Sequence, residues 1–175
     1  MRDALADLGQ LVESASVSYA VIGGHAVNTW LEPRFTADID VTLIADPVGL
    51  VRLRDALTKA GFEVAQEYGA NQPSGPDFIR FVSGDRSVVI EFQVAKTELQ
   101  RSVVARAKST VEGVRVATPE DLLVLKLIAD RAKDRVDLEG LARLSNLDWS
   151  YIEDRCAEWD LSGRLASLRR SVTST

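Results

Sequence analysis

Two short stretches decide the fold of this chain: VIGGHAV at residues 21–27 and RFTADID at residues 34–40. The first joins a β-rich run at 17–22 to a glycine pair and then to a helical pattern over 25–31. The second ends on two aspartates and continues as an alternating run to residue 44, which is typical of a strand. We therefore predict a strand, a glycine turn, a helix and a second strand that begins with two carboxylates.

The carboxylate pair consists of Asp38 and Asp40. On a strand their side chains share one face, with Cα atoms about 7 Å apart. At ~5 Å and an effective dielectric constant of ~20, their repulsion costs about 3 kcal/mol. A divalent cation between them removes that cost, and oxygen ligands suit Mg²⁺ or Mn²⁺. The alternative is that both side chains belong to the solvated face of a half-buried strand.

The glycine pair, Gly23 and Gly24, stands at the predicted strand-to-helix turn. Glycines allow backbone N–H groups to approach a ligand closely, and the N-terminus of the following helix attracts anions. A plain tight turn is the alternative interpretation. A phosphate-binding turn followed by a carboxylate pair is nevertheless what nucleotide chemistry requires, because the carboxylates then hold metals beside the phosphates.

The rest of the chain predicts a mixed α/β part followed by a helical part. A helix opens at Pro47 and runs to residue 60, strands occupy 77–82 and 87–94, and a further helix covers 97–108. Thr118 and Pro119 form a strong helix start, followed by a helix over 122–132 that is apolar nearly all round and by more helix to about residue 171. We therefore predict a core at 1–117 and a C-terminal helical region at 118–175 that packs on it.

Composition excludes several classes of protein. The chain has 175 residues, 46% of them hydrophobic and 27% charged, which is ordinary for a soluble globular protein. It contains neither an apolar run of the ~20 residues that a membrane helix needs nor a signal peptide, so we expect a cytoplasmic protein without membrane contact. The net charge of −5 argues against strong non-specific binding of duplex nucleic acid, although residues 101–175 carry 13 basic and 12 acidic residues. Cys156 is the only cysteine and is expected to be a buried apolar residue.

Together the two stretches resemble the signature of the DNA polymerase β-like nucleotidyltransferase superfamily. The Gly-Gly-His and Arg-x-Thr-x-Asp-Ile-Asp details are closest to one branch, the AbiEii-like toxins of bacterial toxin–antitoxin systems. TPEDL at 118–122, LKL at 125–127 and RAKD at 131–134 also resemble that branch. The resemblance covers roughly residues 17–145. It implies an α/β (α+β) nucleotidyltransferase core, with a mixed sheet flanked by helices, plus a C-terminal helical bundle.

The resemblance also implies a site. Its third carboxylate matches Glu91, whose arm is longer than that of the more usual Asp, and the alternative is an exposed strand glutamate. The candidate catalytic and metal-binding residues are thus Asp38, Asp40 and Glu91. The candidate nucleotide-binding residues are Gly23, Gly24, His25, Arg34 and Lys126.

Lys126 has two interpretations. It stands inside the apolar run at 122–129, where a lysine is costly unless its ammonium group reaches water or an anion. On one continuous helix it shares a stripe with Lys133 and Asp137. It either pairs with Asp130 at i, i+4 or, as the resemblance implies, faces the triphosphate.

The implied activity is transfer of a nucleoside monophosphate from a nucleoside triphosphate to an acceptor hydroxyl, with Mg²⁺ or Mn²⁺ as cofactor and pyrophosphate as leaving group. We predict that the acceptor is an RNA 3′ end, in particular that of tRNA, and that the protein is a toxin held in check by an antitoxin partner. The alternatives are a small-molecule acceptor such as an aminoglycoside, a protein side chain, or a degenerate binding or antitoxin protein.

Overall fold

The computed structural model describes residues 2–173, with side chains from residue 5 onward. The chain divides into two compact units. The first unit comprises Met1–Ala26 and Arg34–Ala117, and the second comprises Val27–Pro33 and Thr118–Thr175. No helix in the described part is long and apolar enough to cross a membrane.

The first unit is built on a seven-stranded mixed sheet with the order β3-β4-β5-β2-β1-β7-β6. The β2–β5 and β1–β7 pairs are parallel, and the other neighbours are antiparallel. The mixed sheet predicted from the sequence is thus confirmed. The strand bounds are β1 Ser18–Ile22, β2 Asp38–Ile44, β3 Phe62–Tyr68, β4 Phe78–Ser83, β5 Val89–Val94, β6 Lys108–Ser109 and β7 Arg115–Val116.

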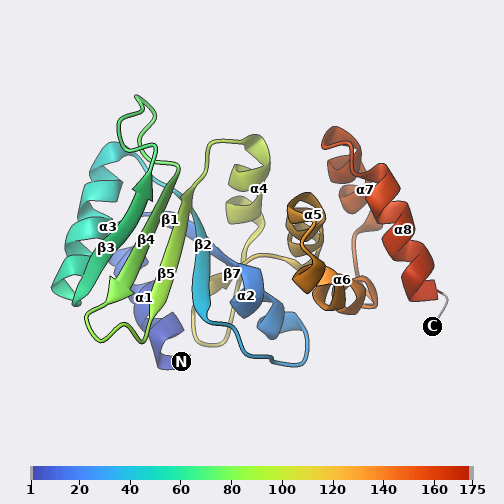
Figure 1. Cartoon of the computed structure of the whole chain (residues 1–175), viewed down its shortest axis with the longest axis horizontal. Helices are drawn as coiled ribbons and strands as arrows, with labels where there is room; N and C mark the ends of the chain where they lie inside the picture. The colour runs from blue at the N-terminus through green and yellow to red at the C-terminus, as the bar shows by residue number, and fades with distance from the viewer. Residues whose placement is uncertain (1, 174–175) are drawn as a thin grey trace. The chain divides into compact units, whose positions relative to one another are not determined.

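The sheet is flanked by helices whose ends follow from local sequence. Helices α1 (Arg2–Ser14) and α3 (Pro47–Lys59) pack on each other, with α1 against β1 and α3 against β3, whereas α4 (Glu98–Arg106) contacts β1 and β2 (Figure 1). Asp46 caps α3 by accepting a hydrogen bond from the backbone N–H of Gly49 at 2.6 Å. The helix predicted from Pro47 is therefore confirmed.

Burial alternates along β4 and β5 and along the first four residues of β2. On one face, residues such as Ile39, Phe81, Ile90 and Phe92 are fully buried, and the rings of Phe81 and Phe92 meet edge to face at 5.8 Å. The residues between them are half-buried and point to the other face, which carries Asp38, Asp40 and Glu91. We call it the carboxylate face. One face of these strands thus forms the core, and the other presents polar groups.

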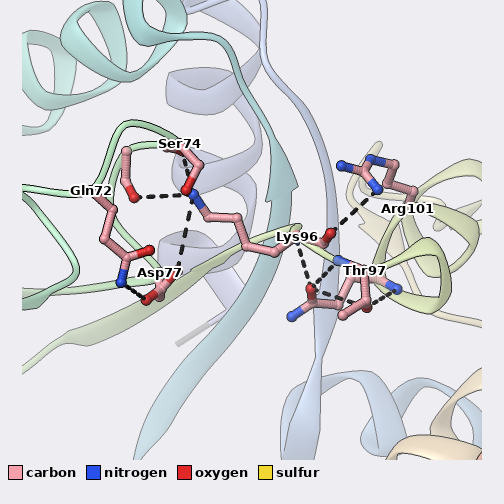
Figure 2. Close-up of polar contacts among 8 residues, drawn as sticks. Gln72, Ser74, Asp77, Lys96, Thr97 and Arg101 are labelled. Carbon is pink, nitrogen blue, oxygen red and sulfur yellow. Dashed lines mark hydrogen bonds and ion pairs between the residues drawn. The ribbon is translucent and has the colours of Figure 1, made fainter.

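Lys96, between β5 and α4, fixes the connection from β3 to β4 (Figure 2). Its ammonium group donates to the backbone oxygens of Ser74 and Gly75 and lies 4.0 Å from Asp77 Oδ1. Directly after it, Thr97 and Gln100 form a capping box that starts α4. In the parallel pair β2–β5, Asp38 pairs with Val89 at the start of both strands, and Leu43 pairs with Val94 near their ends. Lys96 comes after β5, so it lies beyond the strand ends opposite to Asp38.

The second unit contains four α-helices that pack on one another in the described residues: α5 Pro119–Ala129, α6 Arg135–Ala142, α7 Trp149–Glu158 and α8 Ser162–Thr173. The last residues of α2 (Gly23–Trp30) also belong to it. Thr118 caps α5 as predicted, and Asp121 in the first turn accepts a hydrogen bond from the hydroxyl of Tyr151 on α7 at 2.6 Å. Cys156 is fully buried, as predicted.

One helix is shorter than predicted. Helix α5 ends at Ala129 because Asp130 adopts the left-handed conformation, with φ 49°, and a 3₁₀ turn at Ala132–Asp134 follows. The prediction of a helix to residue 132, and of one continuous stripe through Lys126, Lys133 and Asp137, is therefore wrong. Asp130 forms its ion pair with Arg164, at 2.9 Å.

Candidate active site

Strand register assembles the centre of the carboxylate face. Ile22 pairs with Asp40 across β1 and β2, Asp40 pairs with Glu91 across β2 and β5, and Glu91 pairs with Arg80 across β5 and β4. Paired residues project from the same face of a sheet. Asp40, Glu91 and Arg80 therefore form one row, and Asp38 lies two residues from Asp40 on the same face.

The glycine pair forms the first turn of α2, where the sequence predicted a turn before a helix at residue 25. Gly23 has φ +64°, and a Cβ atom there would lie only 2.0 Å from Asp40 Oδ2. A Cβ at Gly24 would lie 2.5 Å from Thr36 Oγ1. Both positions thus require glycine, because the start of α2 lies directly against Asp40 and the loop that leads to it.

Replacing Gly23 by Ala should displace the Asp40 carboxylate and lower the rate of the nucleotidyl transfer that the sequence resemblance implies by at least about a hundredfold, because misplacement by about 1 Å has effects of that size. The left-handed backbone adds a stability loss of about 1–2 kcal/mol. Gly61→Ala is the matched control, since Gly61 has φ +86° and nothing within 4 Å of its Cβ position. The measurements are single-turnover rates and urea unfolding. Equal activity losses in the two variants would contradict this account.

His25 lies in this first turn of α2, and Arg34 lies in the loop between α2 and β2. Burial lowers the pKa of His25, and the nearby Asp38 carboxylate opposes the shift without reversing it. At neutral pH the imidazole is therefore neutral and can donate one hydrogen bond, but it does not act as a cation. Arg34 is exposed, and one of its Nη atoms donates to the backbone oxygen of Phe35 at 3.1 Å.

The structure adds two residues that the sequence reasoning missed. Arg80 donates from Nε, at 2.8 Å, and from Nη2 to the same oxygen of Glu91, and these hydrogen bonds raise the pKa of Arg80. The signal in the sequence was the alternation of β4, which places residue 80 with the polar set. Phe35 is 79% exposed, three residues before Asp38. The exposure of this ring beside β2 could not be inferred from the sequence alone.

The donor set fits a divalent metal only in part. Asp38 and Asp40 offer oxygen ligands, and the absence of a side chain at Gly23 lets Asp40 Oδ2 lie against the start of α2. Mg²⁺ is commonly held by one or two carboxylates together with substrate phosphates, so this pair is sufficient. Among the described side chains, however, no three of His, Cys, Asp or Glu are grouped so that they could hold a metal ion together. Glu91 is bound to Arg80 instead.

Lys126 lies on α5 in the second unit, where its ammonium group is buried. It donates to Asp134 Oδ1 at 2.7 Å and to Asp137 Oδ2 at 2.8 Å. The alternative pair with Asp130 is thus replaced by a pair of buried aspartates from the 3₁₀ turn and α6. Two anions already satisfy Lys126, which favours a structural role.

Several solved structures have a similar fold. The antibiotic-resistance factor ANT(2'')-Ia has 16% identity and a TM-score of 0.59, with 100% of both chains covered. An antigenic nucleotidyltransferase-like protein from Paracoccidioides brasiliensis has 18% identity and a TM-score of 0.57, over 95% of this chain and 90% of that one. JHP933 from Helicobacter pylori has 20% identity and a TM-score of 0.52, over 98% and 78%. These likenesses establish the fold as that of nucleotidyltransferases.

The family follows from the sequence. The profile of the nucleotidyl transferase AbiEii toxins, of type IV toxin–antitoxin systems, matches residues 9–162. The chain therefore belongs to the AbiEii family and is a nucleotidyltransferase. Members of this family generally use divalent metal ions. Among curated proteins, none matches this chain.

Proposed function

We propose that the protein transfers a nucleoside monophosphate from a nucleoside triphosphate to the 3′ hydroxyl of an RNA, in particular tRNA, and that it acts as a toxin restrained by an antitoxin. The observation that carries the site is the close approach of Gly23 to Asp40 Oδ2 at the start of α2. It supports a site where phosphates bind backbone N–H groups beside the carboxylates. The choice of an RNA as acceptor rests on the family and on the exposed side chains described below.

Each group on the carboxylate face has a role in this proposal. The bond that forms joins the acceptor oxygen to the α-phosphorus, and the bond that breaks links the α-phosphorus to the bridging oxygen of the leaving pyrophosphate. Asp38 and Asp40 would hold Mg²⁺, which supplies charge neutralisation at the phosphates and activation of the acceptor hydroxyl. Glu91, the register partner of Asp40, would receive the hydroxyl proton. Backbone N–H groups at Gly23 and Gly24, neutral His25 and Arg34 would bind the phosphates.

Two observations favour RNA over a cationic small molecule. In the second unit, Arg131, Lys133, Arg135 and Arg143 are exposed within thirteen consecutive residues and can contact phosphates. Exposed Phe35 offers a face on which a base can stack. A structure of ANT(2'')-Ia contains adenylyl-2''-tobramycin, so an aminoglycoside is the rival acceptor.

The test is to incubate the purified protein, Mg²⁺ and each labelled triphosphate with total tRNA and, separately, with an aminoglycoside panel. We expect label on tRNA, and none on tRNA whose 3′ end has been oxidised with periodate, because the acceptor hydroxyl is then missing. Expression should also arrest growth in the wild type but not in the Asp40→Asn variant. Label on the antibiotic and none on RNA, without a growth defect, would replace the proposal with a resistance enzyme.

A further inference from the structure

Arg80 is bound to Glu91 across the neighbouring strands β4 and β5. The two residues are partners in the β4–β5 register, and both hydrogen bonds from the guanidinium group end on Glu91 Oε1. The Glu91 side chain is 15% exposed and that of Arg80 is 40% exposed. The Glu91 carboxylate is therefore largely buried, whereas the Arg80 guanidinium group retains access to solvent.

The three carboxylates share one face of the sheet but do not form a group of metal ligands. Asp40 and Glu91 are register partners on one face, so the backbone already brings them together. Yet no three-carboxylate group able to hold a metal exists among the described side chains. Because Oε1 of Glu91 accepts two hydrogen bonds from Arg80, the lone pairs of this oxygen are directed to the guanidinium group, and the positive charge of Arg80 opposes a cation at the same carboxylate.

We propose that Arg80 is a positioning residue that withholds Glu91 from the metal site and releases it when the substrate's phosphates draw the guanidinium group away. This inference rests on the proposed function, because it assumes a metal at Asp38 and Asp40. A guanidinium group and a divalent cation repel each other and compete for the same carboxylate. The fork of donors on arginine suits phosphate as well as carboxylate, so a nucleotide can offer Arg80 a replacement partner. Arg80 also has an aromatic neighbour on β4, because its guanidinium carbon lies 5.9 Å from the centroid of the Phe78 ring.

The test measures Mn²⁺ binding without nucleotide, by the electron paramagnetic resonance signal of free Mn²⁺. Four proteins are compared: the wild type, Glu91→Gln, Arg80→Met and the double variant. In the wild type, where Arg80 holds Glu91, Glu91→Gln should change the Kd for Mn²⁺ by less than about twofold. In the Arg80→Met background, where Glu91 is released, the same replacement should weaken Mn²⁺ binding by at least roughly fivefold.

Arg54→Met is the matched control. Arg54 also donates to a glutamate, Glu67, and its side chain is 31% exposed, but the pair joins α3 to β3 on the opposite face of the sheet. In that background, Glu91→Gln should again change the Kd by less than about twofold. Thermal unfolding of every variant checks that the fold is retained.

Equal effects of Glu91→Gln in the wild-type and Arg80→Met backgrounds would overturn the inference, because Glu91 would then be a ligand always or never. That result leaves the proposed function standing, provided that Asp40→Asn still weakens Mn²⁺ binding. If Asp40→Asn has no effect on Mn²⁺ binding, the metal site itself is absent and both proposals fail. The titration contains neither nucleotide nor acceptor, so a failure to detect transfer to tRNA does not affect its outcome.

Discussion

Replacing Asp40 by Asn should lower the rate of nucleotidyl transfer by at least about a thousandfold while leaving the fold intact, because in the proposed site this carboxylate would hold the divalent cation that neutralises the reacting phosphates. Asp40 lies between Asp38 and Glu91 on the carboxylate face and against the start of α2. Asparagine has nearly the same shape, so packing beside Gly23 is kept. Its neutral amide also relieves repulsion between neighbouring carboxylates, so stability should stay within about 0.5 kcal/mol of the wild type.

Single-turnover rates with a labelled triphosphate and urea unfolding measure the two effects of Asp40→Asn separately. Asp55→Asn is the control, since Asp55 is exposed on α3 and loses the same charge far from the site in sequence and in topology. It should leave both quantities unchanged. Retained transfer in the Asp40 variant would rule out catalysis at this pair, and a large loss of stability would show that Asp40 serves the fold.

The second large effect is expected at Lys126. Lys126→Met should lower the free energy of unfolding by about 3–5 kcal/mol, because it leaves two buried carboxylates without their shared cation. The side chains of Lys126, Asp134 and Asp137 are at most 5% exposed. Burial raises the pKa of Asp134, but hydrogen bonds from Arg131 and Lys126 outweigh it, and the pKa lies below its ordinary value.

Urea unfolding measures this stability loss, with Lys133→Met as the control because Lys133 is exposed in the same segment. Adding Asp134→Asn and Asp137→Asn to the Lys126 variant should restore part of the stability, since no buried charge is then left unpaired. The alternative role of Lys126, binding of the triphosphate, makes the opposite prediction. A tenfold rise in the KM for the triphosphate with unfolding unchanged would support that role.

Short-range sequence signals predicted most of the first unit. The strand that begins at Asp38 was predicted with its observed bounds, because the alternation of polar and apolar residues determines which side faces the core. The helix from Pro47 and the cap at Thr118 likewise depend on a few adjacent residues. The carboxylate pair and the glycine pair lie close together in the sequence, so their association could also be inferred.

The interactions that were missed depend on contacts between elements. The Arg80–Glu91 pair requires the register of β4 against β5, which the hairpin signal at residues 83–85 does not determine. The partners of Lys126 depend on the left-handed residue Asp130, which ends α5 and returns the chain toward it. Aspartate seldom adopts that conformation, so nothing in the sequence marked a helix end at residue 130. Helical periodicity therefore favoured a longer helix.

The central claim, a metal and nucleotide site at Asp38 and Asp40, is tested most directly by a crystal structure of the protein with Mn²⁺ and a non-hydrolysable nucleoside triphosphate. Anomalous scattering locates Mn²⁺ independently of the refined coordinates. We predict an anomalous peak that places Mn²⁺ within bonding distance of carboxylate oxygens of both Asp38 and Asp40. The triphosphate should lie against the backbone N–H groups of Gly23 and Gly24. An ordered nucleotide elsewhere, with no Mn²⁺ bonded to either aspartate, would contradict the account.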